Sequence, residues 1–156
     1  ANIIHGGGLQ TMFIPTLSIF MATAISGMLE GVGFWNDIRQ LLERAKTRSD
    51  VFAANVGLAF LTGAVGCSQA IAVVMTHSIM RITYAQRGIQ DEDVMLDFEN
   101  SGILIAPLQP WNIAAYVPIV MVGTSSTGYV PFAFFLYLVP LIYWLRLRKQ
   151  DQPIIR

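Results

Sequence analysis

Three long stretches of the chain, residues 6–29, 51–80 and 100–145, contain no Lys, Arg, Asp or Glu. Each stretch exceeds the roughly 18 to 20 residues that a helix needs to cross the hydrocarbon core of a bilayer. A soluble helical core can account for one such run, but three in a short chain indicate membrane spans. We therefore predict an all-α, polytopic membrane protein.

Full spanning helices are predicted at three places, residues 9–29, 101–122 and 129–145. The first contains several small side chains, which allow the close helix packing that supplies much of the association energy in lipid. The last has Tyr129 and Trp144 near its two ends, where aromatic side chains meet the membrane interfaces, and a basic cluster follows it. Because Lys and Arg favour the cytoplasmic side, the C-terminus is predicted to be cytoplasmic.

After the first span, residues 34–48 place apolar side chains at helical spacing, with Arg39, Arg44, Lys46 and Arg48 among the other positions. This pattern is typical of an amphipathic helix that lies in the membrane interface. The basic residues in so short a loop also place it on the cytoplasmic side.

Residues 51–84 are too long for one span, because about 34 residues would make a helix about 50 Å long. Gly63 and Gly66, beside small polar residues, suit a break in a membrane helix, since the freed backbone groups can face protein or a cavity. We favour a re-entrant hairpin with its tip at this break, which keeps Arg81 and Arg87 on the cytoplasmic side. Two short spans satisfy the same constraint and remain the alternative.

The span at residues 101–122 is interrupted by Pro107 and Pro110, and Trp111 and Asn112 follow directly. Proline lacks the backbone N–H that continues a helix, and it restricts the residue before it. We predict a broken helix here. A simple proline kink, which membrane helices tolerate, is the alternative.

Composition agrees with a membrane protein and excludes several other classes. Apolar residues make up 54% of the chain and charged residues 13%, about half the usual charged share of a soluble domain. The net charge is zero, so no nucleic-acid partner is expected. Cys67 is the only cysteine, which excludes an intrachain disulfide and disfavours a metal site built on cysteine.

The sequence contains no constellation typical of an enzyme and no motif for a cofactor. It has no nucleophile elbow, no His-Glu-x-x-His and no phosphate-binding loop, and His5 and His77 have no nearby partner in the sequence. We therefore expect no catalytic residues, no cofactor, and no metal beyond a transported sodium ion.

Two interrupted apolar segments in one chain indicate a transport site, because secondary transporters bind ions where broken helices meet near the midplane. Channels also use re-entrant loops, so the signal is shared between the two classes. A proton-coupled step needs a titratable group, and Glu99 is the acid closest to the second break. Neutral side-chain oxygens suit a sodium ion that must also leave, and the candidates at the two breaks are Thr62, Ser68, Gln69, Gln109 and Asn112.

Four short motifs make the chain similar to a known family. They are Gly6-Gly7-Gly8-Leu9 with Met12, Leu96-x-x-Glu99-Asn100-Ser101-Gly102, Pro107-x-x-Pro110-Trp111-Asn112, and Tyr129-x-Pro131-x-Ala133-Phe134-Phe135. Through them the chain resembles the C-terminal half of the NhaC family of sodium/proton antiporters over almost its whole length. The Pro-Trp-Asn element is the most distinctive of the four.

The resemblance implies that residues 1–156 form one half of an inverted-repeat transporter whose N-terminal half is absent from this sequence. Where the family usually reads Glu-Asp-x-Gly-Thr, this chain has a glutamate followed by Asn100, Ser101 and Gly102. The resemblance makes Asn100 and Ser101 further candidates for binding a cation or substrate, and Gly102 a further helix-break residue. A carboxamide coordinates a cation through its oxygen but carries no proton, so proton coupling falls to Glu99 or to the absent half.

From the resemblance we expect sodium/proton antiport across the inner cell membrane by alternating access, with ions bound at the broken helices. Exchange of small organic anions or amino acids, which relatives in this family also perform, is the alternative within the family. A channel or a non-transporting membrane subunit is the alternative outside it. The expected partners are the lipid bilayer, the absent N-terminal half, sodium ions and protons or a small solute, and a second copy in a homodimer.

Overall fold

The computed structural model describes residues 45–123, 125 and 128–150, together with scattered positions between 13 and 33. In this part of the chain the regular structure is helical and contains no strand, as the predicted all-α class requires. The elements are α3 (Arg48–Gly66), α4 (Gln69–Gln86), α5 (Asp91–Phe98), the π-helix η1 (Glu99–Ile103), the 3-10 helix η2 (Ala106–Leu108), α6 (Ile113–Val122), the 3-10 helix η3 (Val130–Phe132) and α7 (Phe134–Gln150).

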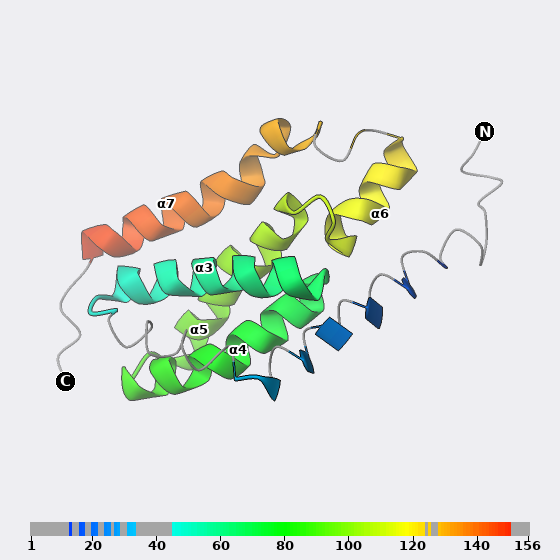
Figure 1. Ribbon diagram of the computed structural model, residues 1–156. Coiled ribbons are helices and arrows are strands. Elements are labelled where there is room, and N and C mark those ends of the chain that lie inside the picture. The colour runs from blue at the N-terminus through cyan, green and yellow to red at the C-terminus, as the bar shows by residue number, and fades with distance from the viewer. Residues whose placement is uncertain are drawn as a thin grey trace.

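Helix α3 lies at the centre of the described helices, with α4 on one side and α7 on the other (Figure 1). Its buried face includes Asn55, Leu58 and Thr62, which recur at the three- to four-residue spacing of a helix. The π-helix η1 and the 3-10 helix η2 also contact α3. On the α7 side, Phe52 meets Tyr143 edge to face, with ring centroids 4.9 Å apart. The central helix is therefore the element against which the others are placed.

A capping box begins α3. Thr47 is the N-cap and accepts the backbone N–H of Asp50 at 3.2 Å, while the Asp50 carboxylate accepts the N–H of Thr47 at 3.1 Å. This reciprocal pair satisfies N–H groups that have no partner in the first turn of a helix, and it fixes the helix start at Arg48. The interfacial helix predicted at residues 34–48 is thus wrong at its C-terminal end, because the cap assigns Arg48 to α3. Residues 45–47 are not helical, and residues 34–44 of that predicted helix lie outside the described residues.

Helices α3 and α4 form an antiparallel hairpin with Cys67 and Ser68 in the turn. Cys67 adopts a left-handed φ of 49°, and its N–H bonds to the Gly63 carbonyl at 3.0 Å, which ends α3. The turn falls within the predicted tip, and antiparallel helices are common to both predicted arrangements, the re-entrant hairpin and the two short spans. Of the helices in the described residues, α3 alone is long and apolar enough to cross a membrane.

The helical path that begins with α5 is interrupted near the two prolines. Helix α5 continues into η1, and η2 ends at Leu108. Helix α6 starts only at Ile113, after the N-cap Asn112, so four residues separate the two helical parts. The interruption lies where Pro107 and Pro110 predict it, and its length makes it a break rather than a kink.

The structure describes only part of the span predicted at residues 9–29 and all of the span predicted at residues 129–145. Within residues 9–29 only single positions are described; those in helical conformation include Phe13 and Phe20, which are exposed, and the remainder lies outside the described residues. The segment predicted at residues 129–145 starts with η3 and continues as α7, which reaches Gln150. The helix runs past the predicted end because the Arg and Lys residues that follow are good helix formers.

Candidate functional site

Residues 63–69 at the turn of the hairpin meet residues 109–113 at the break before α6, and we call this contact the junction. The last turn of α3 leaves carbonyl groups without helical partners, and the first turn of α6 leaves N–H groups. One bond joins the two ends directly, because the N–H of Ile113 donates to the Cys67 carbonyl at 2.9 Å. The two interrupted segments are therefore fixed to each other where both lose their helical hydrogen bonds.

Trp111 and Asn112 bond to the end of α3. The indole Nε1–H of Trp111 donates to the Ala64 carbonyl at 3.2 Å, and Asn112 Nδ2 donates to the Gly63 carbonyl at 3.4 Å. The other end of the Asn112 amide accepts the N–H of Ala114 at 3.1 Å and so caps α6. Trp111 is exposed and Asn112 is fully buried. The Trp-Asn element thus satisfies polar backbone groups at both sides of the junction.

Gln69, the first residue of α4, bonds to the broken segment that contains Pro107. Pro107 has no N–H to donate to the carbonyl four residues earlier, which belongs to Ile103. Gln69 Nε2 donates to this Ile103 carbonyl at 3.0 Å and replaces the missing bond. Pro110 lies within the break itself. Each interrupted segment therefore satisfies carbonyl groups of the other.

Gln109 has an unpaired oxygen in the junction. Its Nε2 donates to the Phe60 carbonyl at 2.6 Å, and the side chain is 1% exposed. Its Oε1 has no hydrogen-bond partner among the described residues. A Cβ at Gly63 would lie 3.1 Å from this oxygen, so a glycine there leaves room for the amide. A buried amide oxygen without a partner is costly in a protein core and is a suitable ligand for a cation.

Thr62 and Ser68, the other candidate ligands on the hairpin, differ in how they are bonded. The Thr62 hydroxyl is fully buried, 2.9 Å from the Leu58 carbonyl and 2.8 Å from the hydroxyl of Thr76 on α4. Thr62 therefore bonds α3 to α4. Ser68 is the half-buried N-cap of α4, and its side chain makes no capping hydrogen bond. Of the two hydroxyls, that of Ser68 is the more available to a ligand.

The residues singled out around position 100 lie in or at the start of η1, away from the junction. Ser101 is buried and its hydroxyl donates to the Asp97 carbonyl at 2.6 Å. Asn100 is half-buried and donates to the Leu96 carbonyl at 2.7 Å. Gly102 is buried against α4. Glu99 is exposed on the described part of the chain.

A charged centre that sequence reasoning missed lies at the opposite end of α3 from the junction. The guanidinium of Arg48 bonds to both carboxylate oxygens of Asp97, each at 2.8 Å, and Asp97 is fully buried. The same carboxylate accepts the hydroxyl of Tyr84 at 2.8 Å and that of Tyr143 at 3.3 Å. Through these bonds Asp97 of α5 is linked to α3, α4 and α7.

The sequence does contain a weak signal for this centre. Asp97 and Ser101 are four residues apart and share a helix face, and both are buried. Ionisable residues inside a membrane protein are costly and mark paired or functional positions. Arg48 and Asp97 are 49 positions apart, however, so no local pattern could have shown that they pair.

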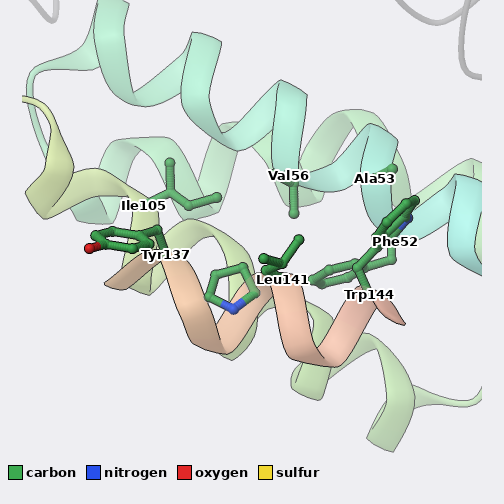
Figure 2. A pocket seen from close by; sticks show the side chains of 8 residues that line it. Phe52, Ala53, Val56, Ile105, Tyr137, Leu141 and Trp144 are labelled. Carbon is green, nitrogen blue, oxygen red and sulfur yellow. The ribbon is translucent and has the colours of Figure 1, made fainter. Parts of the chain in front are cut away.

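An apolar cavity of about 330 Å³ lies between α3 and α7. Its lining carries no amide, carboxylate or basic side chain, so it offers nothing to hold an ion. Nor does the described part of the chain contain a group of three or more His, Cys, Asp or Glu side chains suited to a metal ion. The lining residues, shown in Figure 2, are Phe52, Ala53, Val56, Ile105, Tyr137, Pro140, Leu141 and Trp144.

Comparison with known proteins gives consistent matches. A family model described as the Na+/H+ antiporter family matches residues 1–145. The Na(+)/H(+) antiporter NhaC of Bacillus subtilis is 31% identical over 150 residues, which cover 91% of this chain and 32% of that protein. The NhaC antiporter of Alkalihalophilus pseudofirmus is 25% identical over 146 residues, covering 90% of this chain and 31% of the relative.

A third relative, an uncharacterized Na(+)/H(+) antiporter of Haemophilus influenzae, is 22% identical over 134 residues and covers 85% of this chain and 29% of its own length. The chain thus spans about a third of the length of the curated relatives it matches. No solved structure matches the chain significantly.

Proposed function

The chain belongs to the Na+/H+ antiporter family, and from this we propose that it forms part of a multi-pass transporter that exchanges sodium ions for protons across the cell membrane. The whole protein works by alternating access, with an inverted N-terminal half opposite this one. The support is the family match over residues 1–145, the names of the two NhaC relatives, and the contact between two interrupted helical segments.

We place the cation at the junction, and the unpaired Oε1 of Gln109 is the observation that carries this assignment. The amide nitrogen of Gln109 is held by the Phe60 carbonyl, which fixes the direction of the oxygen. Asn112 holds the backbone around it rather than binding the ion itself, because both of its amide atoms are used in hydrogen bonds. Gln69 holds the broken segment through its amide nitrogen, which donates to the Ile103 carbonyl. Ser68 is the second ligand we propose at this site.

Proton coupling is assigned to Glu99. The other acid nearby, Asp97, is fully buried, and its carboxylate oxygens accept hydrogen bonds from Arg48 and two tyrosine hydroxyls. Glu99 is exposed on the described surface, where it can exchange protons with water or face the absent half. We therefore retain the carboxylate of Glu99 as the proton carrier.

Exchange of a small organic anion is a second candidate function, and one observation favours it. The N-termini of α4 and α6 both lie at the junction, and helix N-termini carry partial positive charge that attracts anions. The hydroxyl of Ser68, without a capping bond, lies at the first of these N-termini. The names of the relatives favour sodium/proton exchange, so the anion is kept as an outcome of the test.

The proposed sodium site is tested by replacing Gln109 in the full-length protein reconstituted in liposomes. Gln109→Met keeps the length of the side chain and removes its amide oxygen, together with the nitrogen that donates to the Phe60 carbonyl. We expect the KM for sodium uptake to rise about tenfold, equivalent to about 1.4 kcal/mol, with the amount of inserted protein unchanged. Tyr129→Phe is the control, because it removes a hydrogen bond to the Pro107 carbonyl of the same broken segment without removing a proposed ligand.

A Gln109→Met variant with the sodium KM of the wild type would exclude the Gln109 oxygen as a ligand. Sodium flux that is independent of any proton gradient would instead support a channel. No response to sodium, together with flux of a small carboxylate, would establish the second candidate.

A further inference from the structure

Asn55 carries a second unpaired oxygen, in the middle of α3. The side chain is fully buried and faces the π-helix η1. Its Nδ2 lies 2.8 Å from Ser101 Oγ and 3.4 Å from the Asp97 carbonyl. Its Oδ1 has no hydrogen-bond partner among the described residues. Because the nitrogen is held by η1, the amide cannot turn to relieve the oxygen without losing those bonds.

The element opposite Asn55 is itself unusual. A π-helix is a rare conformation that occurs mostly as a single turn within an α-helix, frequently at a functional site. Here it separates α5 from the helix that leads to the prolines, and Ser101 is its buried hydroxyl. The hydroxyl of Ser101 donates to the Asp97 carbonyl at 2.6 Å, so its oxygen keeps a lone pair for another partner. One lone pair of Ser101 Oγ accepts Asn55 Nδ2, which leaves its second lone pair and the unpaired Oδ1 of the same amide as the free acceptors of this buried setting.

The local charge does not oppose a cation at this position. The carboxylate of Asp97 is paired with the guanidinium of Arg48, and Arg48 lies about two turns from Asn55 along α3. The carbonyl of Asp97 faces Asn55 and Ser101 instead. The ligands near Asn55 are therefore uncharged oxygens, which bind a sodium ion weakly enough for it to leave.

We propose that Asn55 Oδ1 and Ser101 Oγ form a second subsite for the transported sodium ion, on the η1 side of α3. It is separate from the junction, because Gln109 contacts α3 at Phe60 and Gly63, five and eight residues further along the helix, or about 8 and 12 Å. This inference rests on the proposed sodium/proton exchange and adds a ligand to it. Asn55 is then a residue that binds the ion and not only a bond between α3 and η1.

The test uses full-length protein in liposomes and measures the KM and kcat for sodium uptake, together with the shift in melting temperature that sodium causes. Asn55→Leu keeps the volume and removes both amide atoms. We expect its sodium KM to rise at least tenfold and its sodium-dependent thermal shift to fall by more than half. Asn55→Asp keeps oxygens at the same position, and we expect a sodium KM no higher than that of the wild type at alkaline pH.

Thr76→Val is the matched control, because it removes a fully buried α4 hydroxyl that bonds to Thr62 of α3. Its melting temperature should fall while its sodium KM stays within about twofold of the wild type. If Asn55 has only a structural role, Asn55→Asp, which loses the nitrogen donor, should impair sodium binding as much as Asn55→Leu does. That result, or a wild-type sodium KM in Asn55→Leu, would overturn the proposal.

The proposed function and the proposed second subsite are contradicted by different results. If the wild-type protein shows no sodium-dependent flux, the proposed function fails and the Asn55 subsite fails with it. If the wild-type protein transports sodium and Asn55→Leu has an unchanged sodium KM, only the second subsite is overturned. Where Asn55→Leu does not insert, Asn55→Asp alone decides between the two outcomes.

Discussion

Asp97 shows how one side chain can hold several helices together. It accepts two bonds from Arg48, one from Tyr84 and one from Tyr143, and it is fully buried. A buried charge is tolerated only when it is paired and hydrogen-bonded, and here every donor comes from a different helix. We therefore infer that the Asp97 centre stabilises the helix bundle. The unpaired amide oxygens of Asn55 and Gln109 are instead the proposed ligands for sodium.

We predict that Asp97→Asn lowers the free energy of unfolding by about 3 kcal/mol, because the guanidinium of Arg48 is left in a mostly buried position without a counter-charge. Denaturant unfolding of the full-length protein in detergent micelles measures this change. The double variant Arg48→Met with Asp97→Leu should regain more than half of the loss, since two apolar side chains leave no charge unpaired. An Asp97→Asn variant that unfolds like the wild type would show that the pair contributes nothing.

The roles of single residues were harder to predict from the sequence than the positions of the helices. Thr62, Gln109 and Asn112 were selected from the sequence as polar residues at breaks, and Ser101 was selected from the family resemblance. All four are buried in the structure. Their roles depend on which backbone groups lie opposite, and these come from segments far away in the chain. Asn55 was not predicted as a binding residue, because a single amide in an apolar run does not indicate a site. Its unpaired oxygen is visible only in the structure.

At the scale of elements, the hairpin turn and the helix break fall where the sequence predicts them. Gly63 and Gly66 with small polar neighbours mark the first, and the two prolines mark the second, because both are local chemical reasons for a helix to end. The π-helix at Glu99–Ile103 had no such local reason and was not predicted. The capping box of Thr47 and Asp50 fixes the start of α3 at Arg48. This start was not predicted, because apolar residues at helical spacing run through residues 34–48 without a visible interruption.

Asn112 joins two elements, and its two roles can be separated by substitution. Asn112→Ala removes the N-cap of α6 and the bond to the Gly63 carbonyl, so it should lower the free energy of unfolding by about 1 kcal/mol or more and sharply reduce sodium transport. Asn112→Ser keeps a neutral capping oxygen and removes the amide donor, and should recover most of the stability. Thermal unfolding and sodium uptake of both variants in the full-length protein measure the two effects.

Recovery of stability without recovery of transport in Asn112→Ser would assign transport to the contact between Asn112 and the hairpin. If both variants transport sodium normally, the contact between the two breaks is dispensable and the junction is not the site.

At the scale of the whole molecule, α3 is the central helix, with α4 and α7 on its two sides (Figure 1). The α3–α4 hairpin and the broken segment before α6 bond to each other at their breaks. The chain spans about a third of its curated relatives, so the proposed exchange requires parts of the protein beyond this sequence. The helices described here would move as one unit, because α3, α4, α5 and α7 are tied together through Asp97. In the proposed alternating-access exchange, this unit changes its position against the rest of the protein.

The central claim, coupled exchange of sodium and protons, is tested most directly by the collapse of an imposed pH gradient in liposomes that contain the full-length protein. We predict that added sodium dissipates the gradient, that potassium at the same concentration has a much smaller effect, and that Glu99→Gln abolishes the response while the protein remains inserted. A gradient that persists after sodium is added to the wild-type protein would contradict the account.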